Sequence, residues 1–131
     1  MAALDTNILV RWLVEDDAQQ LAQVRSLFQA VLAGGGTLFV PITVVIELEW
    51  VLRSHYQLKK PAFIEVLGRL LNSPELSFHT ESTVDLAIVL FTNNTADFAD
   101  CIHTAIASFA GENPLYTFDQ QAAKLTGAKL V

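Results

Sequence analysis

The stretch at residues 37–53, TLFVPITVVIELEWVLR, decides the fold class of this chain. Its first part, TLFVP, is a short apolar run closed by a proline, which indicates a buried strand. The remainder, through Arg53, is typical of a helix, and Thr43 is its expected N-cap. A strand that leads directly into a helix is the repeating unit of a parallel α/β sheet.

The same alternation of strands and helices continues on both sides of this stretch. Further strands are expected at residues 2–5, 75–79, 114–119 and 128–131, and further helices at 7–16, 18–34, 61–71, 82–94, 96–111 and 120–125. Gly34 and Gly111 are expected to end their helices, and Asp97 is a natural cap. The strand at residues 2–5 is expected to be buried. We therefore predict an α/β fold with a mostly parallel sheet covered by helices on both faces.

The composition fits one domain over residues 1–131 with a substantial core. Hydrophobic residues make up 52% and charged residues 17% of the chain, which excludes general disorder. No apolar run is long enough to span a bilayer, and residues 1–15 lack a basic leader, so we expect no secretory signal. The single cysteine, Cys101, excludes an intrachain disulfide and a cysteine-cluster zinc site, and fits a reducing cytoplasm.

The net charge of −6 argues against a simple basic nucleic-acid-binding protein. That argument weakens if several acidic residues are metal ligands, because most of the acidic excess then belongs to one site. The eight basic residues are scattered. Arg11, Lys124 and the pair Lys59–Lys60 are the candidates for phosphate contacts.

Two glutamates interrupt the apolar run of the 37–53 stretch. Glu49 has Arg53 four residues later on the same helical face, so we expect Glu49 to be an exposed, paired residue. Glu47 has no basic residue three or four positions away. A carboxylate without a local cation calls for another explanation, either as a mobile surface acid or as part of a site.

Three other acids are expected near the same edge of the sheet as Glu47. Asp5 and Asp119 directly follow predicted strands, and Asp100 lies one turn into its helix. In open parallel sheets, ligands bind outside the carboxyl ends of the strands. Each acid also has a structural alternative: Asp5 as a helix cap, Asp97 with Asp100 as a capping arrangement, and Asp119 as a turn or cap residue.

Carboxylates gathered at one edge raise one another's pKa unless a cation is present. Carboxylate and water oxygens suit Mg²⁺ or Mn²⁺, and no cysteine or histidine cluster competes for zinc. Such a site can orient a water molecule and neutralise charge that builds on a phosphate. The pattern therefore indicates metal-assisted phosphoryl chemistry.

These residues together resemble the PIN-domain ribonucleases, and in particular the VapC-type toxins of type II toxin–antitoxin pairs. The matching motifs are LDTNILV, VPITVVIELEWVL, DFADCIHTAIA and YTFDQQAAKL, in the family's order and over essentially the whole chain. The resemblance implies a three-layer α/β/α domain whose central sheet has four to five strands. It also implies a Mg²⁺- or Mn²⁺-dependent endoribonuclease that cuts single-stranded or structured RNA.

The resemblance implies roles for specific residues. The metal ligands and catalytic residues would be Asp5, Glu47, Asp100 and Asp119, and the supporting residues Thr6, Asn7, Asp97 and Thr117. Asn7 is expected to orient a carboxylate by hydrogen bonding. Cys101 is interpreted as core packing, and His79 and His103 as packed or surface residues.

The resemblance also implies partners. Members of the family act on RNA such as tRNA or ribosomal RNA, form homodimers and are held inactive by a small antitoxin protein. Trp50, Tyr56, Phe63 and Leu67 are candidates for a dimer interface or, alternatively, for the core.

Two other functions are compatible with parts of the pattern. A phosphatase with Asp5 as nucleophile would need a second acid two residues later, where this chain has Asn7. A catalytically inactive PIN-like module that only binds RNA or protein would be expected to lack some of the acids, and all are present.

Overall fold

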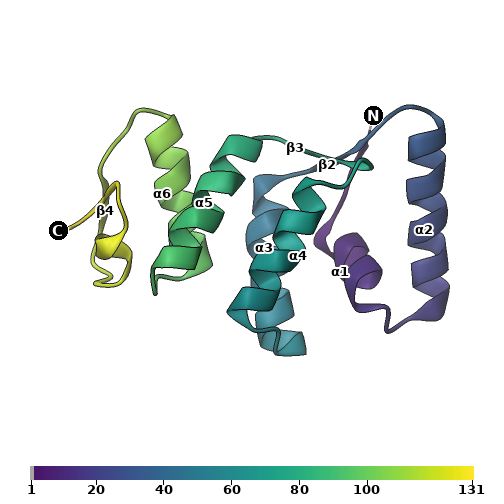
Figure 1. Cartoon of the computed structure of the whole chain (residues 1–131), viewed down its shortest axis with the longest axis horizontal. Helices are drawn as coiled ribbons and strands as arrows, with labels where there is room; N and C mark the ends of the chain where they lie inside the picture. The colour runs from purple at the N-terminus through teal and green to yellow at the C-terminus, as the bar shows by residue number, and fades with distance from the viewer. Residues whose placement is uncertain (1) are drawn as a thin grey trace. The chain divides into compact units, whose positions relative to one another are not determined.

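The computed structural model describes residues 2–131 and shows an α/β fold with parallel strands, which confirms the predicted class. The contacts within the chain divide it into two compact units, Met1–His79 and Thr80–Val131. Each unit has its own parallel strands and its own helices (Figure 1). That the chain acts as the single domain expected over residues 1–131 stays a prediction.

The first unit carries a three-stranded parallel sheet in the order β1-β2-β3. Its elements are β1 (Ala2–Ala3), α1 (Thr6–Val14), α2 (Ala18–Ala33), β2 (Leu38–Val40), α3 (Ile42–Tyr56), α4 (Lys60–Leu71) and β3 (Leu76–Phe78). Ala2 lies opposite Leu38, and Val40 lies opposite Phe78. Because the strands are parallel, the residues that follow β1 and β2 emerge at the same edge of this sheet.

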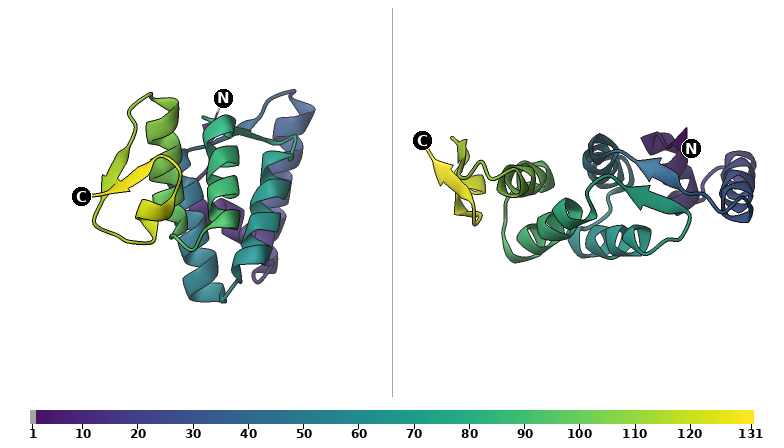
Figure 2. Two further views of the ribbon diagram at one scale, coloured as in Figure 1. Left: turned by 60° about the vertical axis from the view of Figure 1, so that its left-hand side comes forward. Right: turned by 90° about the horizontal axis from the view of Figure 1, so that it is seen from above.

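Apolar side chains from the strands and from one face of each helix form the core of the first unit. The residues buried most completely include Leu9, Leu38, Leu48, Leu67 and Leu70. The rings of Trp12 and Phe28 meet edge to face with their centres 4.4 Å apart, which joins α1 to α2. Both views in Figure 2 show α4 running beside α3.

Two expectations for the first unit are wrong in detail. Ala2 and Ala3 are exposed, because β1 is an edge strand that pairs only with β2, and burial begins at Leu4. The N-cap position of α3 is Pro41, and Thr43 lies inside the helix. Pro41 has the extended backbone of a cap residue, so the helix starts directly after the strand and continues to Tyr56.

The second unit consists of two long helices followed by a pair of parallel strands. Its elements are α5 (Glu81–Asn93), α6 (Phe98–Phe109), β4 (Leu115–Thr117), the 3₁₀-helix η1 (Ala122–Lys124) and β5 (Ala128–Leu130). Helices α5 and α6 lie side by side in Figures 1 and 2, with the rings of Phe91 and Phe98 5.2 Å apart between them. Cys101 is fully buried on α6, as its interpretation as core packing requires.

The candidate dimer residues divide between core and surface. Phe63 and Leu67 are buried in the core of the first unit, so the interface interpretation is wrong for these two. Their positions on α4 place them on the face that packs inward. Trp50 is 52% exposed, and Tyr56 donates a hydrogen bond to Asp16. Within residues 2–131, no helix is long and apolar enough to cross a membrane.

The packing of α1 generates a stability prediction. Leu9 has no exposed surface, whereas Leu32 on α2 is 42% exposed. We expect Leu9→Ala to lower the free energy of unfolding by about 2–5 kcal/mol, because it removes buried apolar surface and leaves a cavity. The matched change Leu32→Ala should cost less than about 1 kcal/mol. Urea unfolding followed by circular dichroism measures both, and equal effects would contradict this assignment of the core.

Candidate functional site

Asp5 stands at the junction between β1 and α1, at the edge of the first sheet. Its carboxylate oxygen Oδ1 accepts a hydrogen bond from the backbone N–H of Thr6 at 2.7 Å, and its backbone is extended. The structural alternative for Asp5, a helix cap, is therefore confirmed. The cap engages only one of the two carboxylate oxygens, so the exposed side chain can still bind a cation through the other.

Glu47 is tied to the same junction by a side-chain hydrogen bond. The buried hydroxyl of Thr6 donates to the Glu47 carboxylate oxygen Oε1, which joins the start of α1 to the second turn of α3. The parallel pairing of β1 with β2 is what brings these two helix starts together. The structure thus places Asp5 and Glu47 on either side of one threonine, as the edge argument predicted for this pair.

Glu49 corrects one expectation from the sequence. It pairs with Arg53 as predicted, with 2.8 Å between Arg53 Nε and Glu49 Oε2, but its side chain is only 10% exposed. Glu47, in contrast, lies on the exposed side of α3. Glu49 is buried because it shares the inward face of α3 with Leu48 and Leu52, and the exposed guanidinium of Arg53 reaches back to neutralise it.

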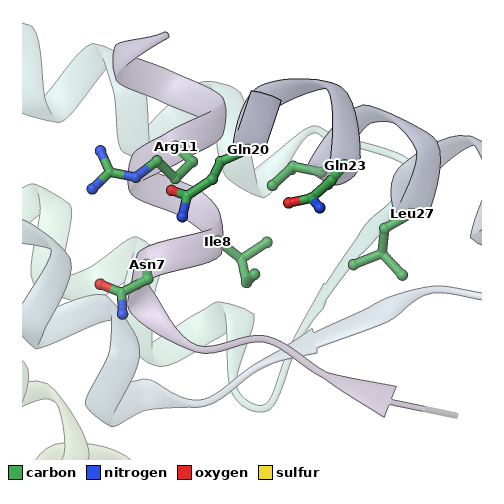
Figure 3. A pocket seen from close by; sticks show the side chains of 7 residues that line it. Asn7, Ile8, Arg11, Gln20, Gln23 and Leu27 are labelled. Carbon is green, nitrogen blue, oxygen red and sulfur yellow. The ribbon is translucent and has the colours of Figure 1, made fainter. Parts of the chain in front are cut away.

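Asn7 lies on α1, and its expected role in orienting a carboxylate stays a prediction. Its amide lines a hollow of about 250 Å³ between α1 and α2, together with Ile8, Arg11, Gln20, Gln23, Val24 and Leu27 (Figure 3). The hollow thus combines three apolar side chains with the amides of Asn7, Gln20 and Gln23 and the guanidinium of Arg11.

Asp100 is the acid of the second unit whose protonation is most perturbed. Partial burial raises the pKa of Asp100 above its ordinary value of 3.8, and the carboxylates of Asp119 and Asp97 raise that pKa further. His103, which is exposed one turn later on α6, acts in the opposite direction. The shift shows that Asp100 lies among like charges, an environment that a bound cation would relieve.

The first turn of α6 carries this arrangement of acids. Asp97 occupies the N-cap position, but its side chain makes no capping hydrogen bond, so the capping alternative is not supported for it. Thr104, which sequence reasoning did not select, is fully buried and donates its hydroxyl to the backbone carbonyl of Asp100 at 2.8 Å. This contact could have been predicted from the sequence, because a helical threonine often donates its hydroxyl to the backbone carbonyl four residues earlier.

Asp119 follows β4 and closes the turn into η1. Its oxygen Oδ1 accepts hydrogen bonds from the backbone N–H groups of Gln121 and Ala122, both at 2.8 Å. The hydroxyl of Thr117 accepts a hydrogen bond from the Asp119 N–H at 3.0 Å. The predicted cap role of Asp119 is confirmed, and Thr117, which was expected only as a supporting residue, contacts its backbone. The exposed carboxylate keeps its second oxygen for another partner.

The structure brings the predicted acids together in two sets. Asp5 and Glu47 share Thr6 in the first unit, and in the second Asp119 and Asp97 add to the effect of burial in raising the pKa of Asp100. Taken unit by unit, residues 2–131 contain no group of three His, Cys, Asp or Glu side chains that could hold a metal ion. All predicted ligands offer carboxylate oxygens, and this donor set fits Mg²⁺ or Mn²⁺.

The comparison with known proteins identifies the class. The family model of the PIN domain matches residues 2–128, so this chain belongs to the PIN-domain family.

A particular similar protein is the VapC ribonuclease of Aquifex aeolicus (strain VF5), which is 26% identical over 125 residues. The alignment covers 95% of this chain and 92% of that protein. The resemblance to the PIN family expected from the motifs is thereby confirmed.

The hydrogen bond between Thr6 and Glu47 generates a prediction about metal affinity. We expect Thr6→Val to weaken Mn²⁺ binding by about 10–100-fold, because the Glu47 carboxylate no longer has the donor that orients it. Thr6→Ser retains a hydroxyl and should restore most of the affinity. Isothermal titration calorimetry with Mn²⁺ measures both variants. Equal affinity of Thr6→Val and the wild type would show that Thr6 has only a structural role.

The raised pKa of Asp100 generates a prediction about stability and pH. A carboxyl with a higher pKa in the folded state holds its proton more tightly when folded, so its ionisation disfavours the fold as pH rises through that pKa. In EDTA, Asp100→Asn should therefore raise the melting temperature near about pH 7 and change it little near about pH 4. Asp85→Asn, at an exposed position on α5, is the matched control and should show no such pH-dependent gain.

Proposed function

We propose that this protein is a Mg²⁺- or Mn²⁺-dependent endoribonuclease and the toxin of a toxin–antitoxin pair. The observation that carries the proposal is the hydrogen bond from Thr6 to Glu47 beside Asp5, in a chain of the PIN family. It holds two acids together at the sheet edge where ligands bind in parallel α/β folds. The name of the similar protein, a ribonuclease, supports RNA as the substrate class.

The proposed reaction is hydrolysis of an RNA phosphodiester bond through the carboxylates Asp5, Glu47, Asp100 and Asp119. A bound Mg²⁺ or Mn²⁺ would supply Lewis-acid chemistry, lowering the pKa of a water molecule and neutralising charge on the phosphate. The four carboxylates would hold the ion, with Thr6 and Thr117 fixing the orientation of Glu47 and the backbone of Asp119. By family resemblance, the products carry 5′-phosphate and 3′-hydroxyl ends.

The raised pKa of Asp100 supports a cation in this reaction. Ionising Asp100 beside Asp97 and Asp119 is unfavourable without a nearby positive charge. His103 acts in the opposite direction and lowers that pKa, and a bound metal ion would add further positive charge beside Asp100.

The proposal extends to partners and location. We propose a small antitoxin protein as the inhibitor, a tRNA or ribosomal RNA as the substrate, a homodimer as the working form and the cytoplasm as the compartment. These proposals rest on the VapC-type resemblance and on the similarity to a VapC ribonuclease. Trp50, which is 52% exposed, and Tyr56, which is partly exposed, both lie on α3 and are the remaining candidates for a dimer contact among those selected from the sequence.

The test is an RNA-cleavage assay with purified, antitoxin-free protein and Mg²⁺ or Mn²⁺. We expect Asp5→Asn and Glu47→Gln each to lower the cleavage rate by about 100-fold or more, because each removes a charged metal ligand. Asp85→Asn and Glu112→Gln change exposed acids outside the set and should leave the rate within about twofold of the wild type.

Two outcomes would contradict the proposal. Cleavage that survives EDTA, or that neither Asp5→Asn nor Glu47→Gln affects, would rule out the carboxylate metal site. Binding of RNA without cleavage under any metal condition would favour the alternative, a catalytically inactive PIN-like module that only binds RNA or protein.

A further inference from the structure

A second candidate site lies at the turn between α3 and α4, in the first unit. A hollow of about 300 Å³ is lined there by Arg53, Gln57, Leu58, Lys59 and Lys60. Three of the chain's eight basic residues thus surround one hollow, in a protein whose net charge is −6. None of these three residues belongs to the carboxylate set described above.

The charged side chains that line this hollow are all positive. Glu49 pairs with Arg53, whose side chain is nevertheless 57% exposed, and Lys59 is exposed. No aspartate or glutamate lines the hollow. The concentration of cations in one concave place favours an anionic ligand.

The helix ends at the hollow contribute in opposite directions. The start of α4 has Pro61 in its first turn and no side-chain cap, so its positive end faces the turn without a carboxylate. The end of α3 is negative, but its last turn carries Arg53 and His55, and the N–H of Leu58 bonds to the Leu52 carbonyl. The helix ends differ in sign, and the charged side chains that line the hollow between them are all positive.

We propose that this hollow binds a phosphate of the RNA backbone, at a place separate from the carboxylate site. The inference rests on the proposed function, which makes RNA the substrate. It gives an acidic protein the positive surface that a polyanion requires. Lysine and arginine without base-reading partners hold phosphates irrespective of sequence, so the hollow would add affinity and register, and leave base selection to other surfaces.

Helix α3 relates the two sites to each other. Glu47 lies in its second turn and Gln57 caps its end, so the hollow is about 15 Å from Glu47 along the helix axis. Both positions belong to one rigid element of the first unit. An RNA chain held at the hollow would therefore lie at a fixed distance along α3 from Glu47. That distance would determine which phosphodiester bond reaches the carboxylate site.

The experiment measures RNA binding without cleavage, in EDTA, by fluorescence anisotropy of a labelled single-stranded RNA over a range of salt concentrations. We compare the full-length wild type with Lys59→Ala/Lys60→Ala. We expect weaker binding to all RNA sequences, and a slope of log affinity against log salt that is smaller by about 0.7 for each phosphate that the variant no longer neutralises. Lys59→Arg/Lys60→Arg keeps the charges and should restore both values.

The matched control is Arg25→Ala/Lys129→Ala, which removes the same charge at two exposed positions outside the hollow. Equal decreases in affinity for both double variants would overturn the site, because a general charge effect would then explain them. An unchanged salt slope in Lys59→Ala/Lys60→Ala would also overturn it, and normal metal-dependent cleavage in that case would leave the proposed nuclease standing.

A last arm separates RNA from an acidic protein as the ligand. The same variants are titrated with poly-glutamate. If Lys59→Ala/Lys60→Ala no longer binds poly-glutamate but keeps wild-type RNA binding, the hollow takes an acidic protein and the proposal is wrong. If wild-type protein binds no RNA at all and cleaves none, both this inference and the proposed function fail.

Discussion

The parallel pairing of β1 with β2 is the constraint on which the first half of the candidate site depends. It makes Asp5 and the start of α3 emerge at one edge of the sheet, where the Thr6 hydroxyl bonds to Glu47. Two carboxylates delivered to the same edge repel each other in the absence of a cation. The hydrogen bond from Thr6 fixes the position of the Glu47 carboxylate without neutralising its charge. A carboxylate that is both charged and fixed in position is suited to bind a metal ion.

Several of the acids combine an observed structural role with the chemical role that we propose. Asp5 caps α1 and Asp119 caps the turn into η1, each with one oxygen. The capping role predicted as an alternative for Asp5 and Asp119 is therefore correct. It does not exclude metal binding, because the second carboxylate oxygen of each residue remains available. In the second unit, burial raises the pKa of Asp100, and the carboxylates of Asp119 and Asp97 raise it further.

The distribution of charge shows how an acidic protein would act on a polyanion, as we propose. The net charge of −6 is a property of the whole chain, whereas an RNA strand meets local surfaces. Acids that surround a bound cation do not repel phosphate as isolated acids would. The basic side chains at the α3–α4 turn lie at the opposite end of α3 from Glu47. A chain with few cations can still offer phosphate a favourable path if those cations are grouped.

The sequence by itself determined the alternation of strands and helices, the α/β class, the motifs of the PIN family and the pairing of Glu49 with Arg53, because each depends on residues close along the chain. Only the tertiary structure decided which glutamate is buried. Both lie on α3, and nothing local distinguishes the face that packs inward. Packing against the core of the first unit buries Glu49 and leaves Glu47 at the sheet edge, held by a threonine 41 positions away in the sequence.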